Sequence, residues 1–408
     1  MSSRVQASSR DATTPCVPWQ LFRAPAGTGG TPLAPRQSQA RELVQALSSS
    51  IDALAYVAAA PEEQAPEGDV PADGQDAAAA RGPEALAVSA PEDVQHRLQA
   101  VLRRLDTAKE DSASAQEARD AVFHLLEVDV PARLLTCLDD LGFEARKDAM
   151  RLFRDMLRLG PLLGADGQVI EYVRTHPRIS QLLFEGSGRP EVFTHCAQML
   201  RSCTRYPQLV AYLYGQNAMN RLIDLARHQS FDISSEAFSS LRELLLAHKA
   251  VTAAYLQAHF TEFFGLYNGL LQADDYVTQR QALRLLSEVL LDRNFMQVMI
   301  EYVGNDLFLQ IHMNLLRASS RAIQLEAFHI FKIFVANPNK PQRVQQILFR
   351  NKDRLVKLLV SAGKKRESDK NLMQDLKTVV GVLQALGSPV SSRVAPAAAP
   401  ANPVVMVQ

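Results

Sequence analysis

The sequence predicts an all-α protein, an armadillo- or HEAT-like helical-repeat solenoid that curves into a rod with a concave binding surface. The first reason is that apolar residues recur at helical spacing almost without interruption from residue 93 to residue 386. The second is that no convincing run of alternating strand residues occurs there. The third is that one helical pattern returns every 40 to 48 residues, a period typical of armadillo and HEAT arrays.

The repeat becomes visible when helical stretches are aligned on an alanine that precedes a large apolar residue. The pairs are Ala149-Met150, Ala237-Phe238, Ala282-Leu283 and Ala327-Phe328, with a weaker copy at Cys196-Ala197. The successive alanines are separated by 48, 40, 45 and 45 residues. A small side chain at a fixed point lets neighbouring helices approach closely, while the large residue beside it fills the space between repeats.

The chain divides into five parts. Residues 1–37 are rich in Ser, Ala, Arg, Pro and Gly, with Asp11 as the one acidic residue, and predict a disordered head; a transit peptide is the alternative. Residues 38–58 predict a first helix, which Ser38 could cap. Residues 59–91 have almost no large apolar side chain and predict a disordered insertion. Residues 92–387 form the repeat domain, and residues 388–408 predict a disordered tail.

Within the repeat domain, breaks at Gly, Pro, Asn or Asp separate the expected helices. These helices span residues 93–105, 113–126, 131–138, 143–159, 191–204, 217–228, 234–247, 260–272, 276–291, 295–302, 307–316, 321–336, 343–349, 352–361 and 369–386.

Composition excludes several classes of function. The net charge is +0 and the pI is about 7.1, so no global basic excess points to nucleic acid or to an anionic membrane. No apolar run reaches the length of a membrane span. The four cysteines form no CxxC pair, and Cys196 and Cys203 are expected to be reduced core residues of an intracellular protein. We therefore expect a cytoplasmic monomer, with organelle targeting by the head left open.

Motifs for catalysis are missing. The sequence contains no GxxxxGK[ST], HExxH or GxSxG pattern, and we assign no catalytic residue, no metal site and no cofactor. Asp69, Asp73 and Asp76 lack the spacing of an EF-hand, so we expect no calcium loop. A non-enzymatic binding protein is the expectation that remains.

The stretch from Asp275 to Arg293 is the strongest candidate for a binding helix. One face is apolar and should be buried; it consists of Ala282, Leu285, Leu286 and Val289. The opposite face is polar and aromatic; it consists of Tyr276, Arg280, Arg284 and Ser287. An aromatic side chain beside arginines is the composition that dominates interface energies, so we expect this face to bind a partner.

Phe143, Phe231 and Tyr276 occupy the same repeat position, six residues before the alanine. Such an aromatic residue is either a hydrophobic staple at the helix start or an anchor on the concave ridge. We expect Phe143 to be a staple, and Tyr276, with Arg280 one turn on, to belong to a binding surface.

Three segments carry a family resemblance. LEAFHIFKIFVANPNKPQRVQQILFRNKDRLVKLL, DDYVTQRQALRLLSEVLLDR and SFDISSEAFSSLRELLLAHK resemble the HymA-like scaffold family that includes calcium-binding protein 39. The likeness runs from about Phe143 to about Leu386. It implies a scaffold without catalysis that binds and activates germinal-centre-type protein kinases, or a pseudokinase paired with a kinase. It also implies capture of a C-terminal Trp-Glu-Phe peptide from some partners.

The resemblance also implies which residues make contact. The residues that match the family's kinase or pseudokinase surface are Phe231, Tyr276 and Arg280. Arg293 and Phe295 match a second patch that reaches a further kinase. The residues that match the peptide pocket are Met313, Arg350 and Arg354, the arginines replacing lysines.

Departures from the family pattern leave a second reading open. One residue is missing between Arg293 and Phe295, so the phenylalanine could be re-aimed. Gln279 and Gln310 each replace a basic residue, which weakens the positive charge expected around the peptide. The alternative function is a generic armadillo-like adaptor that binds proteins without activating a kinase.

Overall fold

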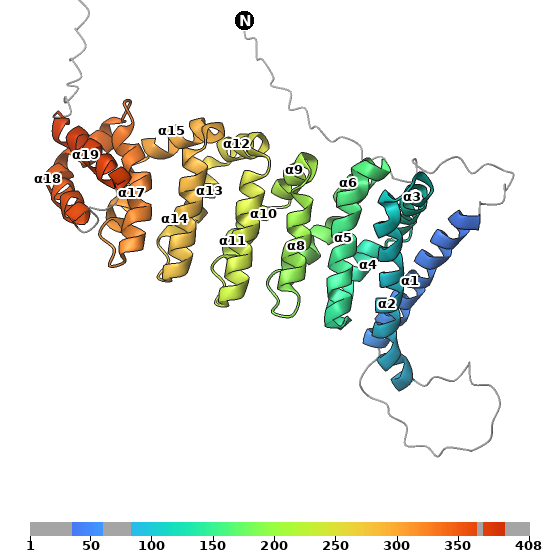
Figure 1. The fold of residues 1–408 in the computed structure, drawn as a ribbon. Helices are drawn as coiled ribbons and strands as arrows, with labels where there is room; N and C mark the ends of the chain where they lie inside the picture. Colours follow the sequence, from blue (N-terminus) through green and yellow to red (C-terminus); the bar gives the residue numbers. More distant parts are fainter. Residues whose placement is uncertain (1–34, 60–82, 365–369, 388–408) are drawn as a thin grey trace, which may run out of the picture.

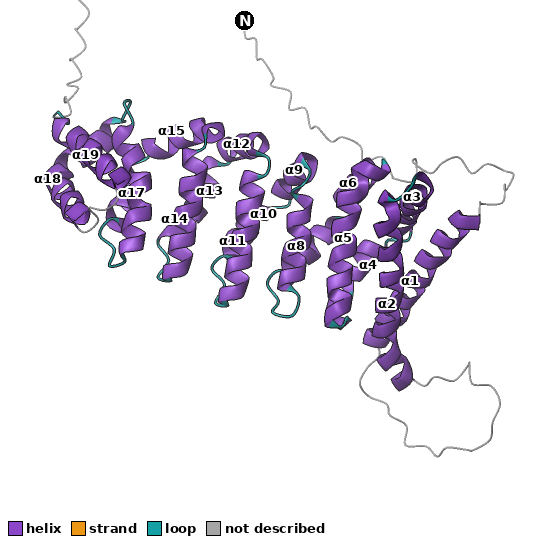
Figure 2. Ribbon diagram, in the orientation of Figure 1, coloured by secondary structure: helices purple, strands orange, loops and turns teal. Residues whose placement is uncertain are grey.

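The computed structural model describes residues 35–59, 83–364 and 370–387, which form an elongated array of helices (Figure 1). Those residues contain helices and loops but no strand (Figure 2), which confirms the all-α helical-repeat solenoid. The α-helices are α1 (Pro35–Ala59), α2 (Pro83–Asp106), α3 (Ser112–Glu127), α4 (Val130–Thr136), α5 (Phe143–Leu163), α6 (Asp166–Thr175), α7 (Pro177–Gly186), α8 (Phe193–Cys203), α9 (Pro207–Gly215), α10 (Ala218–Leu225), α11 (Phe231–Leu246), α12 (Lys249–Ala258), α13 (Phe260–Leu271), α14 (Tyr276–Leu291), α15 (Met296–Gly304), α16 (Asp306–Leu315), α17 (Arg321–Ala336), α18 (Gln342–Lys364) and α19 (Lys370–Ala385). Short 3-10 helices are η2 (Thr107–Lys109), η3 (Leu138–Asp140) and η4 (Arg293–Phe295).

One row of helices forms the backbone of the array. Helices α5, α8, α11, α14 and α17 lie side by side, each packed on the next (Figure 1). Helix α2 packs on α5 and α19 packs on α17, so both extend the row. The helices between them in the sequence pack behind this row, which leaves one face of the row open to solvent.

The repeat alanine is the seventh residue of α5, α11, α14 and α17. The alanines of all five copies are buried, and so is the large residue after four of them. These alanines are Ala149, Ala197, Ala237, Ala282 and Ala327. Because a methyl group lets backbones approach and the neighbouring Met, Phe or Leu fills the gap, the copies stack at a constant spacing.

A second repeated feature lies three residues before the alanine, where a side chain donates to a carbonyl at or just beyond the end of the preceding helix. The four bonds are Arg146 Nε to Leu138 O (3.1 Å), Ser234 Oγ to Ala226 O (2.8 Å), Gln279 Nε2 to Leu271 O (2.9 Å) and Gln324 Nε2 to Ala318 O (2.7 Å). The last carbonyls of a helix lack intrahelical donors, so each side chain closes one repeat onto the previous one. Gln279 is therefore a structural residue in this chain.

Ion pairs join neighbours along the row. They link Asp106 to Arg151, Arg201 to Glu236, Arg242 to Glu288 and Lys332 to Asp375, at 2.5 to 2.8 Å. Exposed pairs of this kind contribute roughly 0–1 kcal/mol each, so they fix the register of the helices more than they stabilise the fold.

A buried polar network connects α13, α15 and α16. The Tyr302 hydroxyl lies 3.0 Å from Asn268 Oδ1 and 3.0 Å from His312 Nε2, and all three residues are buried. Because Tyr302 donates to Asn268 Oδ1, His312 donates its Nε2–H to the hydroxyl, while its Nδ1 has no hydrogen-bond partner among the described residues. Burial lowers the pKa of His312 from 6.5 to about 3.

Several helix boundaries differ from the sequence prediction. Helix α2 begins at Pro83, so residues 83–91 of the expected insertion are helical and Pro91 lies inside the helix. Helix α18 is continuous where two helices were expected, because Asn351 donates its amide to Ile347 O (2.8 Å) and stays in the helix. The expected head up to residue 34, the insertion from 60 to 82 and the tail from 388 lie outside the described residues.

Four helices were missing from the prediction: α6, α7, α9 and α12. Each of them has only nine or ten residues. Helices α7 and α9 also begin with Pro177 and Pro207, at a position where proline suits a helix start.

Acid should weaken the fold through His312. Below pH 6.5 the unfolded chain binds a proton that the buried imidazole refuses until about pH 3, so stability falls as the pH is lowered through this window. The loss is about 1.4 kcal/mol per pH unit, or roughly 2 kcal/mol between pH 7 and pH 5. We expect His312→Gln to reduce this loss in urea unfolding measured at both pH values. His96→Gln, at an exposed position, is the control; equal pH dependence of all three proteins would contradict the prediction.

Candidate protein-binding surface

Helix α14 presents the two faces that the sequence predicts. Tyr276, Arg280 and Arg284 are exposed, and Ser287 is half-buried. The residues of the opposite face, Ala282, Leu285, Leu286 and Val289, are buried. The helix begins at a firm cap, because the Asp275 carboxylate accepts the Thr278 N–H at 2.7 Å. The same hydrogen bond lowers the pKa of Asp275, so the carboxylate stays charged at the helix N-terminus.

Arg280 and Arg284 have no acidic partner. Neither side chain forms an ion pair or a hydrogen bond with another residue in the described part of the chain. On the neighbouring helix α11, by contrast, Arg242 is bound to Glu288 of α14 through its Nε at 2.8 Å. The two arginines of α14 are thus available for a carboxylate or a carbonyl of a bound protein.

Aromatic side chains mark the edge where the row's helices begin. Phe143, Phe231 and Tyr276 are the first residues of α5, α11 and α14, and 68%, 63% and 44% of their surfaces are exposed. The expectation that Phe143 is a hydrophobic staple is therefore wrong. Its ring lies edge-on to the imidazole of His195 on α8, with centroids 6.1 Å apart, and most of it faces solvent. Phe231 and Tyr276 begin adjacent helices, so they belong to one continuous surface.

Phe295 does not lie on this surface. It is fully buried, although Arg293 two residues earlier is exposed. The expectation that Phe295 contacts a partner is therefore wrong. The turn before it is held by Asp292, whose carboxylate binds Lys249 Nζ (2.6 Å) and the Asn294 N–H (2.9 Å). These hydrogen bonds lower the pKa of Asp292 to about 2. Asp292 caps η4 at this turn, and the phenylalanine ring at the end of η4 is buried.

Three large apolar side chains are exposed in place of Phe295. They are Leu291, Met296 and Ile300, each with half or more of its surface accessible. Met296 and Ile300 are four residues apart on α15 and share one face of that helix. The sequence pattern did not single them out, because apolar residues at helical spacing are typical of a buried face.

The residues expected to form a peptide pocket lie on two helices that are in contact, α16 and α18. Met313 is half-buried against the core, while Arg350 and Arg354 are exposed. Gln310 donates to Asp306 O of its own helix at 3.3 Å.

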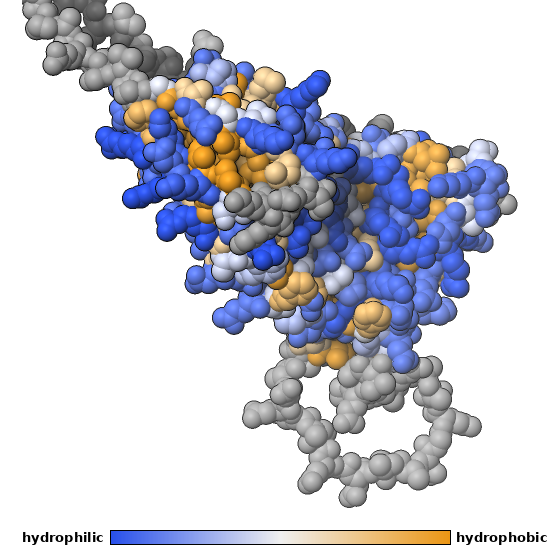
Figure 3. Space-filling view, turned by 60° about the vertical axis from the view of Figure 1, so that its left-hand side comes forward, coloured by the Kyte–Doolittle hydropathy of each residue, from blue (hydrophilic) through white to orange (hydrophobic). Residues whose placement is uncertain are grey.

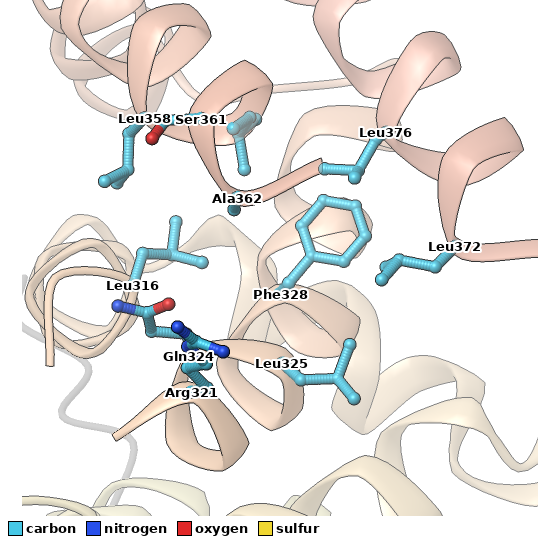
Figure 4. Close-up of a pocket in the computed structure, with 11 residues that line it drawn as sticks. Leu316, Arg321, Gln324, Leu325, Phe328, Leu358, Ser361, Ala362, Leu372 and Leu376 are labelled. Carbon is cyan, nitrogen blue, oxygen red and sulfur yellow. The ribbon is translucent and has the colours of Figure 1, made fainter. Parts of the chain in front are cut away.

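A cavity of about 150 Å³ lies beside these residues, between α16, α17, α18 and α19 (Figure 4). Its apolar lining consists of Leu316, Leu325, Phe328, Leu358, Leu359, Ala362, Leu372 and Leu376. Arg321, Gln324 and Ser361 supply polar groups. Leu316 follows Met313 by three residues, and Leu358 follows Arg354 by four. The cavity therefore begins one helical turn from the expected pocket. Figure 3 shows apolar surface at this end of the molecule.

The described residues hold no group of three or more His, Cys, Asp or Glu side chains that could bind a metal ion. No helix among them is long and apolar enough to cross a membrane. Cys137, Cys196 and Cys203 are free and buried, and burial raises the pKa of each thiol to about 12, as expected for unreactive core residues.

Known proteins are similar in sequence to this chain over most of its length. A family model described as Mo25-like matches residues 35–387. The Degreening-related gene dee76 protein of Auxenochlorella protothecoides is 37% identical over 68% of this chain and 86% of its own length. Calcium-binding protein 39-like of Homo sapiens is 33% identical over 73% and 88%. A Mo25-like protein of Schizosaccharomyces pombe is 34% identical over 72% and 89%.

Conidiophore development protein hymA of Emericella nidulans is a further relative at 32% identity. These relatives confirm the resemblance drawn from the VANPNK and α14 segments. The chain belongs to the Mo25-like family.

Proposed function

We propose that this Mo25-like scaffold binds a protein kinase of the germinal-centre type, or a kinase–pseudokinase complex, and activates it allosterically. The observation that carries the proposal is the combination of exposed aromatic rings on α11 and α14 with unpaired arginines on α14. Phe231 and Tyr276 offer apolar area, and Arg280 and Arg284 offer guanidinium groups that no acid of the described chain neutralises. This composition resembles that of interface hot spots.

The mechanism is a shift of population. A kinase whose regulatory helix moves between an inactive and an active position gains activity when a scaffold binds only the active form. Moving such an equilibrium from 1:99 to 99:1 requires a preference of about 10⁴-fold. A rigid row of helices suits this role, because its side chains hold their positions before the partner arrives and lose little entropy on binding.

Replacing Arg280 of α14 should weaken partner binding and leave the fold intact. We expect Arg280→Ala to lower the affinity for a purified germinal-centre-type kinase by about tenfold, since it removes a charge-assisted hydrogen bond, and to reduce activation in parallel. The measurement is kinase activity with increasing scaffold concentration. Arg174→Ala is the matched control, because this exposed arginine on α6 pairs only with Glu171 of its own helix.

The outcomes distinguish the two functions. A rise in kinase activity that Arg280→Ala weakens and Arg174→Ala leaves unchanged supports activation through α14. Binding without any rise in activity would make the protein a passive armadillo-like adaptor. A kinase that is activated equally by all three proteins would place the contact elsewhere.

We also propose that the region of Met313, Arg350 and Arg354, with the neighbouring cavity, binds a C-terminal Trp-Glu-Phe peptide. Support comes from chemistry: the cavity is apolar and suits aromatic rings, while the arginines suit the glutamate and the terminal carboxylate.

Filling the cavity should block the peptide. Ala362→Phe puts a ring where a methyl group now lines the wall, and Arg354→Ala removes a cation one helical turn from Leu358 of the lining. We expect each to weaken binding of a fluorescent peptide ending in Trp-Glu-Phe by about tenfold in an anisotropy titration. Arg343→Ala serves as the control on the same helix, since Arg343 is exposed and pairs with Asp306. Unaltered affinity in both cavity variants would rule out this site.

A further inference from the structure

Helix α5 repeats the binding pattern of α14 at the other end of the row. Counted from the repeat alanine, Phe143, Lys147 and Arg151 occupy the positions that Tyr276, Arg280 and Arg284 occupy in α14. Phe143 and Lys147 are exposed, and Arg151 is half-exposed. The same face continues with Arg154 and Arg158, both exposed. One side of α5 therefore carries an aromatic ring followed by four cations, of which Lys147 pairs with Glu144 of the same helix at 3.5 Å.

A buried carboxylate organises these arginines. Asp155 has only 2% of its side chain exposed, and three guanidinium groups of the same helix contact it. Arg151 Nε lies 3.4 Å from Oδ2, while Arg154 Nε and Arg158 Nε lie 3.4 and 3.1 Å from Oδ1. Each arginine contacts Asp155 through its Nε, and no Nη group of the three has a hydrogen bond to this carboxylate in the described part of the chain.

The arginines on this face outnumber the carboxylates that they contact. Arg151 also binds both carboxylate oxygens of Asp106 on α2, at 2.7 and 2.8 Å. Three arginines thus share two carboxylates, which leaves positive charge on the face. The Nη groups of Arg154 and Arg158 have no hydrogen-bond partner among the described residues. Asp155 carries one negative charge and is contacted by both Arg154 and Arg158. One positive charge of this pair therefore remains for an external anion.

We propose that this face of α5 is a second docking site, which takes an acidic segment of a partner protein. The segment places an apolar side chain on Phe143 and carboxylates on Arg154 and Arg158, whose free edges match the planar fork of a carboxylate. Phe143 and Arg158 are separated by about 22 Å along the helix, at 1.5 Å per residue. An extended segment of about seven residues covers this distance. The site is separate from the α14 surface and requires no particular kinase.

The test uses the full chain and a defined probe, the peptide Phe-Glu-Glu-Glu-Glu-Glu-Glu with a fluorescent label. We expect binding that weakens with added salt, and at least about tenfold weaker binding by the double variant Arg154→Gln/Arg158→Gln. Because this variant takes partners from Asp155 and could destabilise the fold, Phe143→Ala is the second variant. It alters an exposed ring and should also weaken the peptide.

Controls separate this site from the one proposed on α14. Arg280→Ala should leave the peptide affinity unchanged, and kinase activation, which depends on Arg280, should persist in Phe143→Ala. Absence of binding, or equal binding by the α5 variants and the unaltered chain, would overturn the proposal. Tighter binding of a phosphoserine version of the peptide by tenfold or more would overturn the assignment to carboxylates and make phosphate the ligand.

Discussion

The burial of the repeat alanine in every copy is the constraint on which the rest of the structure depends. Once Ala149, Ala237, Ala282 and Ala327 are buried between helices, the rotation of each helix about its axis is fixed. On α5, α11 and α14, the residues six and two positions before the alanine, and two and five after it, are all exposed or half-exposed. The open face of the row is therefore a grid, in which each helix contributes one stripe of side chains in the same register.

This grid explains why charge pairing is informative in a chain whose net charge is zero. Four cations on the row are matched by an acid on a neighbouring helix, as Arg242 is by Glu288 and Lys332 is by Asp375. Such pairs hold the row in register and leave little charge to attract a partner. The unpaired cations on α14 can attract an acidic partner, which the paired cations cannot. The surplus of positive charge on α5 can do the same.

The sequence was sufficient for features that repeat. The fold class, the repeat alanines and the two faces of α14 follow from periodicity, because four copies carry the same pattern. Features that depend on a single turn could not be predicted. Phe295 is buried because Asp292 binds Lys249 from α12, a contact between residues 43 positions apart. The cavity needs α16 to α19 together, and its leucines look in the sequence like ordinary core residues.

The positions of the two candidate faces limit how one partner could use both. Helices α5 and α14 are separated by three steps along the row, through α8 and α11. At about 8–10 Å per step, the two faces lie roughly 25–30 Å apart. A compact domain centred on Phe231 and Tyr276 would reach α5 only with its rim. Contact with Arg154 and Arg158 is therefore better suited to an extended acidic segment, which follows one helix face and leaves the α14 surface free for a folded domain.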